Sequence, residues 1–535
     1  KEIDPGARIA GPNLASYLNL VIENFLHFSV ENDCLPDTIS WHLLSNRSYN
    51  NARSNVGVYR TVESVAAQLF EQLYPDRESP FPLPIDINEY ASQAEIAVGG
   101  SLLQYLARYD ELKITGALPY WNTANSFGSL LAGQNEPNGA WWLYKWYADM
   151  EGDMAQINVI KAKDDRDAYG YGLYGLSTID DDRKQVNLLF GGTTGRSKIV
   201  FNNITGHADS PSFFAGAEKV HISVWYSGYT GLTGFAVEPT QIIDNDFDII
   251  NGKVAFSVET DYNAVYYAVV TEAVDSTPKA TWFKRYEAED AEERINVQNP
   301  RNVYPISSNS SRSASNGRYI GGIEYPDSVV KFTVTVPVDG NYRLDIVEGS
   351  GSTAQLPAQS GQGTASQRQN SEYFVKIDDQ PSFKIVLRAD YSYEQLGMVT
   401  QYIDLAAGTH TIAISKYNQD TGEAGQGTAT LDCIELTYKG EMGAKPNYRV
   451  QAEFSEYDVD KGLRRGSATP GFEGAGYITG YNSSSNANTR FVLCVPEDGM
   501  YDVKFRIATT SAGTLSVDHD RKNAIITDIP DTNGE

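Results

Sequence analysis

One acidic residue stands where an apolar, strand-like run stops. Residues 83–92 read LPIDINEYAS, and the run ends at Asn88, Glu89 and Tyr90. A carboxylate in this position is either a catalytic group or a surface charge where a strand meets its loop. Three further strand-like runs within the first 150 residues also end on polar or aromatic side chains: Asn13, His42, and Trp121 with Asn122. Whether these residues form one site depends on the elements that carry them.

Those elements alternate between strand and helix. Strand-like runs at 7–13, 38–44, 83–89 and 114–122 are each followed by a helix-like run, the last at 140–150. Such βα units predict parallel strands with right-handed crossovers, in an open sheet or in part of a barrel. Barrel enzymes carry their chemistry at the carboxyl ends of the strands, where the polar residues above would lie. No strand is followed by a glycine-rich phosphate-binding motif, so no nucleotide or other organic cofactor is predicted.

The second helix has the clearest apolar pattern. Its apolar residues recur at helical spacing: Val62, Val65, Ala66, Leu69, Phe70 and Leu73. This spacing predicts one buried stripe, and Thr61 is available as the N-cap.

Composition limits the class of partner. The chain has 535 residues and a formal net charge of -26, and nucleic-acid binding instead requires clustered Lys and Arg. Neutral glycans and calcium fit this charge better. No run approaches the roughly 18 apolar residues of a membrane helix, so membrane insertion is not predicted. Three cysteines are too few for a disulfide framework, and Cys433 and Cys494 lie in strand-like runs where buried free thiols are expected.

The rest of the chain reads as β structure. Short strand-like runs from about residue 156 to 275 are typical of a β-sandwich. Residues 286–438 and 448–535 then form an internal repeat, in which YEAED, GRYIGGI and FTVTVPVDGNYRLDI correspond to VQAEF, AGYITGY and FVLCVPEDGMYDVKF. The shared V-P-x-D-G-x-Y predicts a tight turn between two strands. The second copy has no counterpart to ATLDCIELTY (429–438), so it is expected to be incomplete.

The first copy resembles carbohydrate-binding modules of the family 6 and 35 type, which are jelly-roll β-sandwiches. The resemblance rests on Y-E-A-E, Y-I-G-G-I, the V-P-x-D-G-x-Y hairpin and L-D-x-I-E-L. It implies a structural Ca²⁺ held by Glu287, Glu289 and Asp432, and hard carboxylate oxygens suit that ion. Aromatic rings that stack on sugars are expected in such a module, and four tyrosines are candidates: Tyr319, Tyr325, Tyr391 and Tyr393.

The first 150 residues resemble strands 5 to 8 of the (β/α)₈ TIM barrel of retaining glycoside hydrolases of clan A, most closely those of the family 39 type. The order DPGARIAGPN, DTISWHLL, LPIDINEYAS and ITGALPYWN carries the resemblance, together with GAWWLYKWYADMEG and the sandwich that follows. It implies that Glu89 is the nucleophile of an O-glycosyl hydrolase. Trp121 would stack under the sugar, while Asn13, His42, Asn88 and Tyr90 would bind it or orient the glutamate. His42 is equally well explained as a core histidine.

Retaining hydrolysis also needs a second carboxylic acid about 5 Å from the first. The resemblance places it on a strand that would precede Lys1. Asn135-Glu136-Pro137 has the matching residue types, but it follows the fourth strand and favours a helix start instead. We therefore expect the general acid outside this sequence, on an N-terminal half of the barrel in the same polypeptide or in a partner chain.

The sequence thus predicts a multidomain chain. The expected parts are the C-terminal half of a glycosidase barrel (1–155), a β-sandwich (156–283), a carbohydrate-binding module (284–440) and a truncated second module (446–535). The expected function is a secreted retaining glycoside hydrolase acting on a polysaccharide or glycoconjugate. The alternative is a non-catalytic glycan-binding or structural extracellular glycoprotein of the cell surface or matrix, built on a glycosidase-like barrel that has lost activity. Four glycosylation sequons fit an extracellular location: Asn46, Asn203, Asn309 and Asn482.

Overall fold

The structure is a computed structural model. It describes residues 4–534 except 5, 46, 94, 119–129, 134–135, 161–171, 232–235, 237, 274–280, 292, 296–302, 306–313, 316–317, 351–352, 356–365, 369, 388–395, 444–451, 453–455, 459–460, 467–476, 483–485, 492–499, 520–521 and 533. The chain forms two compact units, Lys1–Asn447 and Tyr448–Glu535. No helix in the described residues is long and apolar enough to cross a membrane.

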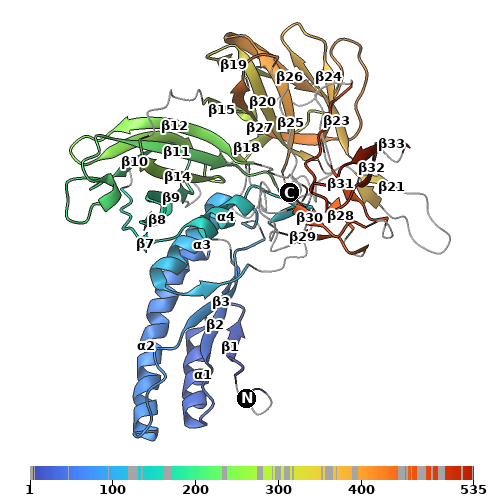
Figure 1. The fold of residues 1–535 in the computed structure, drawn as a ribbon. Helices are drawn as coiled ribbons and strands as arrows, with labels where there is room; N and C mark the ends of the chain where they lie inside the picture. The colour runs from blue at the N-terminus through green and yellow to red at the C-terminus, as the bar shows by residue number, and fades with distance from the viewer. Residues whose placement is uncertain are drawn as a thin grey trace, which may run out of the picture. The chain divides into compact units, whose positions relative to one another are not determined.

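The first unit begins with a four-stranded parallel sheet and helices that run beside it (Figure 1). The strands lie in chain order across the sheet: β1 (Ala10–Leu14), β2 (Thr38–Leu43), β3 (Ile85–Tyr90) and β4 (Thr115–Gly116). The helices are α1 (Asn19–Glu31), α2 (Tyr49–Leu73), α3 (Gly99–Leu112) and α4 (Trp141–Asp149). A short hairpin of β5 (Leu131–Gly133) and β6 (Glu136–Pro137) precedes α4. The predicted succession of parallel strands and helices is confirmed, and its assignment to the C-terminal half of a barrel stays a prediction.

Two boundaries in this part differ from the prediction. Helix α2 begins at Tyr49, so Thr61 lies inside the helix, where its Oγ1 donates to the carbonyl of Gly57 at 3.2 Å. The buried stripe also shifts, and Val65 and Leu73 are about half exposed. Tyrosine and alanine extend the stripe toward the N-terminus, so its buried members are Tyr49, Ala52, Val56, Tyr59, Val62, Glu63, Ala66 and Phe70. Strand β4 has two residues instead of the predicted nine, although 119–122 lie outside the described residues.

An antiparallel β-sandwich follows. Its larger sheet has the order β12-β11-β14-β9-β8-β7, with β7 (Asp153–Met154), β8 (Tyr174–Asp180), β9 (Gln185–Gly191), β11 (Lys219–Ser227), β12 (Thr240–Asp248) and β14 (Val265–Glu272). Strands β10 (Gly195–Phe201) and β13 (Val254–Thr260) pair with each other, and a 3₁₀ turn covers Ser212–Phe214. The strand-like runs are expected to begin at about residue 156, but residues 157–160 form no strand, and β7 forms the ladder with β8 instead.

The sandwich packs closely on the parallel-sheet part. The amide of Gly100 in α3 donates to the carbonyl of Asn263 at 3.1 Å. A Cβ atom on Gly100 would lie 2.0 Å from the carbonyl oxygen of Tyr262, so only glycine fits there. Trp146 of α4 stacks on Tyr267 of β14 with ring centroids 5.4 Å apart. Backbone contact and stacked rings therefore join the two parts.

Residues 283–440 form a second sandwich of two antiparallel sheets. One contains β17 (Val303–Pro305), β18 (Arg318–Ile320), β27 (Ala429–Gly440), β20 (Gly340–Ser350) and β25 (Gly397–Leu405), with β15 (Phe283–Glu287) also on β27. The other contains β16 (Glu293–Ile295), β19 (Val329–Val336), β26 (Gly408–Ser415), β23 (Ser371–Ile377) and β24 (Phe383–Leu387). A 3₁₀ turn covers Ala288–Asp290, and β21 (Thr353–Gln355) pairs with β22 (Ser366–Arg368). We call these residues the binding module, after the role that the sequence predicts for them.

The V-P-x-D-G-x-Y motif does not form the predicted hairpin. Strand β19 pairs with β16 and β26, whereas β20 pairs with β25 and β27, so residues 337–339 lead from one sheet to the other. Alternating apolar residues on both strands are explained equally well by this crossing, because each strand buries one face in the core between the sheets. Cys433 is free and buried, as predicted, and Cys494 lies outside the described residues.

The described residues of the second unit form three short pairs of strands. They are β28 (Glu456–Tyr457) with β31 (Thr489–Arg490), β29 (Arg464–Gly466) with β30 (Tyr477–Thr479), and β32 (Gly513–His519) with β33 (Lys522–Ile529). The strand predicted at 500–505 is not formed. In the binding module the equivalent β20 is paired on both sides, and no described segment of the second unit pairs with 500–505 in this way.

Candidate functional site

Glu89 reaches the open face of the parallel sheet through a β-bulge. Ile85 and Ile87 are buried, so strict alternation would bury residue 89 as well. The register with β2 instead pairs Ser40 with Asp86 and His42 with Glu89, so that three residues of β3 span two of β2. A bulge of this kind redirects the side chains that follow it. Glu89 is consequently 43% exposed.

His42 lies beside Glu89. His42 Nδ1 lies 3.4 Å from Glu89 Oε2, and 17% of the histidine side chain is exposed. The two residues are directly opposite each other in the ladder between β2 and β3. This arrangement suits a histidine that holds a carboxylate in place, one of the two roles open from the sequence.

Asn13 lies at a second register shift, between β1 and β2. Its backbone is left-handed, with φ of 58°, and its Oδ1 accepts hydrogen bonds from Ser40 Oγ and from Asn88 Nδ2, the latter at 3.1 Å. Within the described residues, the buried Oδ1 of Asn88 accepts no hydrogen bond. An unsatisfied amide oxygen is costly unless a ligand or water donates to it. Asn13, Ser40 and Asn88 thus form a polar group beside His42 and Glu89.

Tyr90 does not belong to this group, which corrects its predicted role in substrate binding. The side chain is 2% exposed, and its hydroxyl bonds that of Tyr144 in α4 at 2.7 Å. Its ring packs on Tyr105 and Tyr109 of α3. The bulge that exposes Glu89 turns the next residue into the helix layer. Trp121 lies outside the described residues.

Glu95, which the sequence analysis missed, ties together the loops behind this site. It is completely buried, and Oε1 accepts from the amide of Arg47 at 2.9 Å and from Ser101 Oγ at 3.0 Å. Oε2 accepts from the amide and hydroxyl of Ser92 at 3.0 and 2.8 Å and from the Tyr105 hydroxyl at 3.0 Å. Burial first, and then the charge of Glu95, raise the pKa of Tyr105 well above its usual value. One carboxylate thereby joins the loops that follow β2 and β3.

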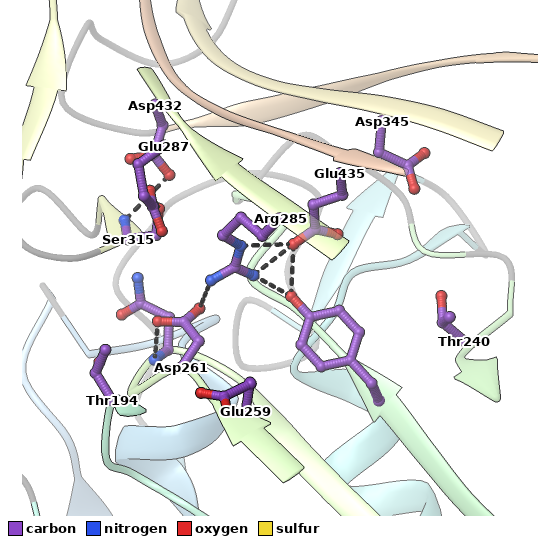
Figure 2. Close-up of polar contacts among 12 residues, drawn as sticks. Thr194, Thr240, Glu259, Asp261, Arg285, Glu287, Ser315, Asp345, Asp432 and Glu435 are labelled. Carbon is purple, nitrogen blue, oxygen red and sulfur yellow. Dashed lines mark hydrogen bonds and ion pairs between the residues drawn. The ribbon is translucent and has the colours of Figure 1, made fainter. Parts of the chain in front are cut away.

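A second candidate site lies in the binding module, at the end of β15. Ser315 joins two carboxyl groups there: its amide donates to Asp432 Oδ2 at 3.1 Å, and its hydroxyl donates to Glu287 Oε2. Figure 2 shows Glu287, Asp432 and Ser315 side by side. Glu289 in the adjoining turn is 6% exposed, and Asp432 is 2% exposed. Asp432 Oδ1 is buried and accepts no hydrogen bond from the described residues.

Burial and mutual repulsion make these carboxyl groups hold protons strongly. Burial raises the pKa of Glu287 to about 7, against the opposing effect of Arg285. Burial and then Glu287 raise the pKa of Asp432 well above its usual value. A cation would relieve both effects, and hard oxygen donors suit Ca²⁺. The donor chemistry fits the predicted ion, although no three metal-ligating side chains converge on one point among the described residues.

The four tyrosines predicted to stack on sugars differ in their exposure and in whether the structure describes them. Tyr319 is 5% exposed and packs in the core, so it offers no face to a sugar, and its prediction is wrong. Strand β18 has only three residues, too few for the alternation of apolar and polar residues to show which side of the strand is buried. Tyr325 is half-buried in the loop after β18 and remains a candidate. Tyr391 and Tyr393 lie outside the described residues. Of the sequon residues, Asn203 and Asn482 are exposed, and Asn46 and Asn309 lie outside the described part.

Comparisons with known proteins connect the chain to glycosidases. No family model matches it. It is 28% identical over 354 residues to 3-O-alpha-D-galactosyl-alpha-L-arabinofuranosidase of Bifidobacterium longum subsp. longum, a match that covers 64% of this chain and 29% of the relative. It is 25% identical over 358 residues to 3-O-beta-L-arabinopyranosyl-alpha-L-arabinofuranosidase of Bifidobacterium pseudocatenulatum, covering 64% and 35%. The chain thus spans about a third of the length of these curated relatives, and both agree with the prediction of a glycosidase.

Two solved structures complete the comparison. The structure of N2152 from Neocallimastix frontalis is 28% identical, with a TM-score of 0.42, and the match covers 51% of this chain and 62% of that chain. The family 35 carbohydrate-binding module from Clostridium thermocellum is 18% identical, with a TM-score of 0.19 and coverage of 29% and 97%. Both scores are too low to establish a shared fold.

Proposed function

We propose that this chain is part of a secreted retaining glycoside hydrolase and that Glu89 is its nucleophile. The observation that carries the proposal is the bulge in β3, which places Glu89 beside His42 at 3.4 Å on the open face of the parallel sheet. A carboxylate held in this way suits attack on an anomeric carbon to form a glycosyl-enzyme. The order of the four strand-like runs, which resembles that of retaining hydrolases of the family 39 type, motivates the same assignment.

Asn13, Ser40 and Asn88 would bind sugar hydroxyl groups. Amide and hydroxyl side chains give orientation to a sugar, and the buried Oδ1 of Asn88 is ready to accept from one of its hydroxyls. His42 would orient Glu89. The names of both relatives specify α-L-arabinofuranosidases, so α-L-arabinofuranosides are the first substrates to test.

The deciding experiment is Glu89→Gln in the full-length enzyme, assayed on an aryl α-L-arabinofuranoside and on arabinofuranose-containing glycans. Loss of the nucleophile is expected to reduce kcat by at least about 10⁴-fold. Glu71→Gln, on the exposed face of α2, is the matched control and should retain full activity. Full activity in the Glu89 variant would refute the assignment. An inactive wild-type protein that still binds these glycans would favour the non-catalytic alternative.

We also propose that the binding module holds Ca²⁺ and a glycan. Glu287, Glu289 and Asp432 would supply carboxylate oxygens to the ion, which would neutralise their charge and hold the end of β15 against β27. Support comes from the buried Asp432 Oδ1, which accepts no hydrogen bond from the described residues, and from the raised pKa of Glu287. Tyr325 is the remaining described candidate for stacking on a sugar.

A further inference from the structure

Arg285 is a buried cation at the junction between the sandwich and the binding module. It lies on β15, the first strand of the module, and only 14% of its side chain is exposed. Its Nη1 lies 2.6 Å from Asp261 Oδ2, and Asp261 belongs to the sandwich, directly after β13. Its Nε donates to Glu435 Oε1 of the module at 2.9 Å. Figure 2 shows Arg285 between Asp261 and Glu435.

A tyrosine of the sandwich completes this cluster. The hydroxyl of Tyr226 on β11 donates to Glu435 Oε1 at 2.7 Å and accepts from Arg285 Nη2. Asp261 and Glu435 are 9% and 6% exposed, and Tyr226 is 3% exposed. Burial opposes the charge of Arg285, but Asp261, Tyr226 and Glu435 outweigh burial and raise its pKa. The three nitrogens of the Arg285 guanidinium therefore contact partners in two domains: Asp261 and Tyr226 of the sandwich, and Glu435 of the binding module.

Such a cluster selects one docking geometry. The flat guanidinium holds its partners in fixed directions, unlike a point charge. A shifted interface would bury Arg285 without Asp261, and an unpaired buried charge is strongly unfavourable. Other contacts across the same junction fix the register too. Arg343 Nη2 donates to Thr240 Oγ1 at 2.6 Å, and the Tyr262 hydroxyl donates to the carbonyl of Ala314 at 2.6 Å.

Backbone contact leaves little room for sliding. A Cβ atom on Gly231 of the sandwich would lie 1.2 Å from the carbonyl oxygen of Leu396, just before β25 of the module. Gly231 has φ of 78°, which also favours glycine. Phe283 of β15 packs on Tyr226 with ring centroids 4.8 Å apart. These contacts surround the Arg285 cluster with close packing.

We propose that Arg285, Asp261, Tyr226 and Glu435 form an orientation lock that fixes the binding module on the sandwich. Domains in one chain usually move relative to each other when their interface is small or polar. Here the lock would make the module present its glycan to the catalytic part from one direction, instead of from a flexible tether. The lock rests on the geometry alone, whereas its use with a glycan rests on the proposed function.

The test compares variants of the full chain by hydrogen exchange and small-angle X-ray scattering. Asp261→Asn removes the charge that the sandwich contributes, and Tyr226→Phe removes one hydroxyl while keeping the ring. Both variants should exchange the amides of β11 and β15 at least about tenfold faster than wild type. Asp261→Asn should also increase the radius of gyration. Glu238→Gln is the matched control, because the Glu238–Lys439 pair crosses the same junction at 3.0 Å but is 58% and 30% exposed.

Unchanged exchange and scattering in both variants would overturn the lock, and so would an equal effect of Glu238→Gln. If Asp261→Asn does not fold, Tyr226→Phe decides the question. Calorimetric binding of an arabinofuranose-containing glycan is expected to be unchanged in Tyr226→Phe. A wild-type chain that binds no such glycan would contradict the proposed function, while faster exchange in the variants would still support the lock.

Discussion

His410 shows how a single residue in the binding module makes stability depend on pH. Its Nδ1 lies 2.7 Å from Asp378 Oδ2, and its Nε2 lies 2.7 Å from the carbonyl oxygen of Ala406. Burial opposes the charged ring, but the bonds to Asp378 and Ala406 outweigh burial and raise the pKa of His410 above 6.5. Burial also opposes the charge of Asp378, but its bonds to His410 and the amide of Thr411 lower its pKa below 3.8.

The pair should therefore stabilise the module mainly at pH values between the lowered pKa of Asp378 and the raised pKa of His410. The contribution of His410 is fully present below its unfolded pKa and is lost as pH rises through its raised folded pKa. The contribution of Asp378 is present above its unfolded pKa and is lost as pH falls through its lowered folded pKa. Because Asp378 is 43% exposed, the total should stay below about 1 kcal/mol.

Urea unfolding of wild type and Asp378→Asn measures this effect. The stability difference between them should be larger at pH 5 than at pH 8.5, since the contribution of the charged His410 is fully present at pH 5 and is lost as pH rises through its raised folded pKa. A difference that is the same at both pH values would show that hydrogen bonding alone explains the pair.

At the scale of elements, Glu95 should matter more than any exposed acid of the parallel-sheet part. Glu95→Gln replaces one oxygen with an amide group that faces a backbone N–H whichever way the side chain turns, that of Arg47 on one side or that of Ser92 on the other. Buried bonds to a charged acceptor are worth more than neutral ones, so a loss of about 2–4 kcal/mol in unfolding free energy is expected. Chemical unfolding measures it.

Glu111→Gln is the control for this prediction. Glu111 also lies on α3, but its pair with Arg53 is 46% and 62% exposed. Its removal should cost less than about 1 kcal/mol. Equal losses in the two variants would mean that Glu95 does not fix the loops after β2 and β3.

An element can be predicted from sequence when the pattern that determines it lies within the element itself. The alternation of LPIDINE and the helical spacing around Val62 and Phe70 are local, so they predicted strand β3 and helix α2. The bulge that separates Glu89 from Tyr90 arises from pairing with β2, and no local pattern contains it. For the same reason the sequence predicts a hairpin at the turn before β20, because a hairpin and a crossing between sheets bury the same face of each strand.

The same distinction between local patterns and distant contacts applies to the residues of the sites. Residue types at strand ends indicated Asn13, His42, Asn88 and Glu89, and the fold brings these four together. Ser40 and Glu95 were missed because their role depends on neighbours far along the chain. Arg285 and Asp261 look like ordinary charges in a chain with 69 acidic residues, and only their burial distinguishes them.

For the whole molecule, the binding module and the sandwich should respond to calcium together. Glu287 and Arg285 are two residues apart on β15, and Asp432 and Glu435 lie close together on β27, so the carboxyl site and the orientation lock share both strands. A ligand that binds only the folded state adds about 2.7 kcal/mol at a hundredfold excess over its Kd. Calcium bound in the module should stabilise the sandwich as well, because the lock joins them.

Scanning calorimetry of the full chain in EDTA and in Ca²⁺ tests this coupling. In wild type, calcium should raise the unfolding temperature of the module and the sandwich by the same amount. In Asp261→Asn, where the lock is weakened, it should raise that of the module alone. Glu287→Gln should abolish the response, while Glu238→Gln should retain it. A wild type that is indifferent to calcium would refute the metal proposal and leave the lock to be judged by hydrogen exchange. A calcium response confined to the module in wild type would refute the coupling, because a fixed junction must transmit stabilisation from one domain to the other.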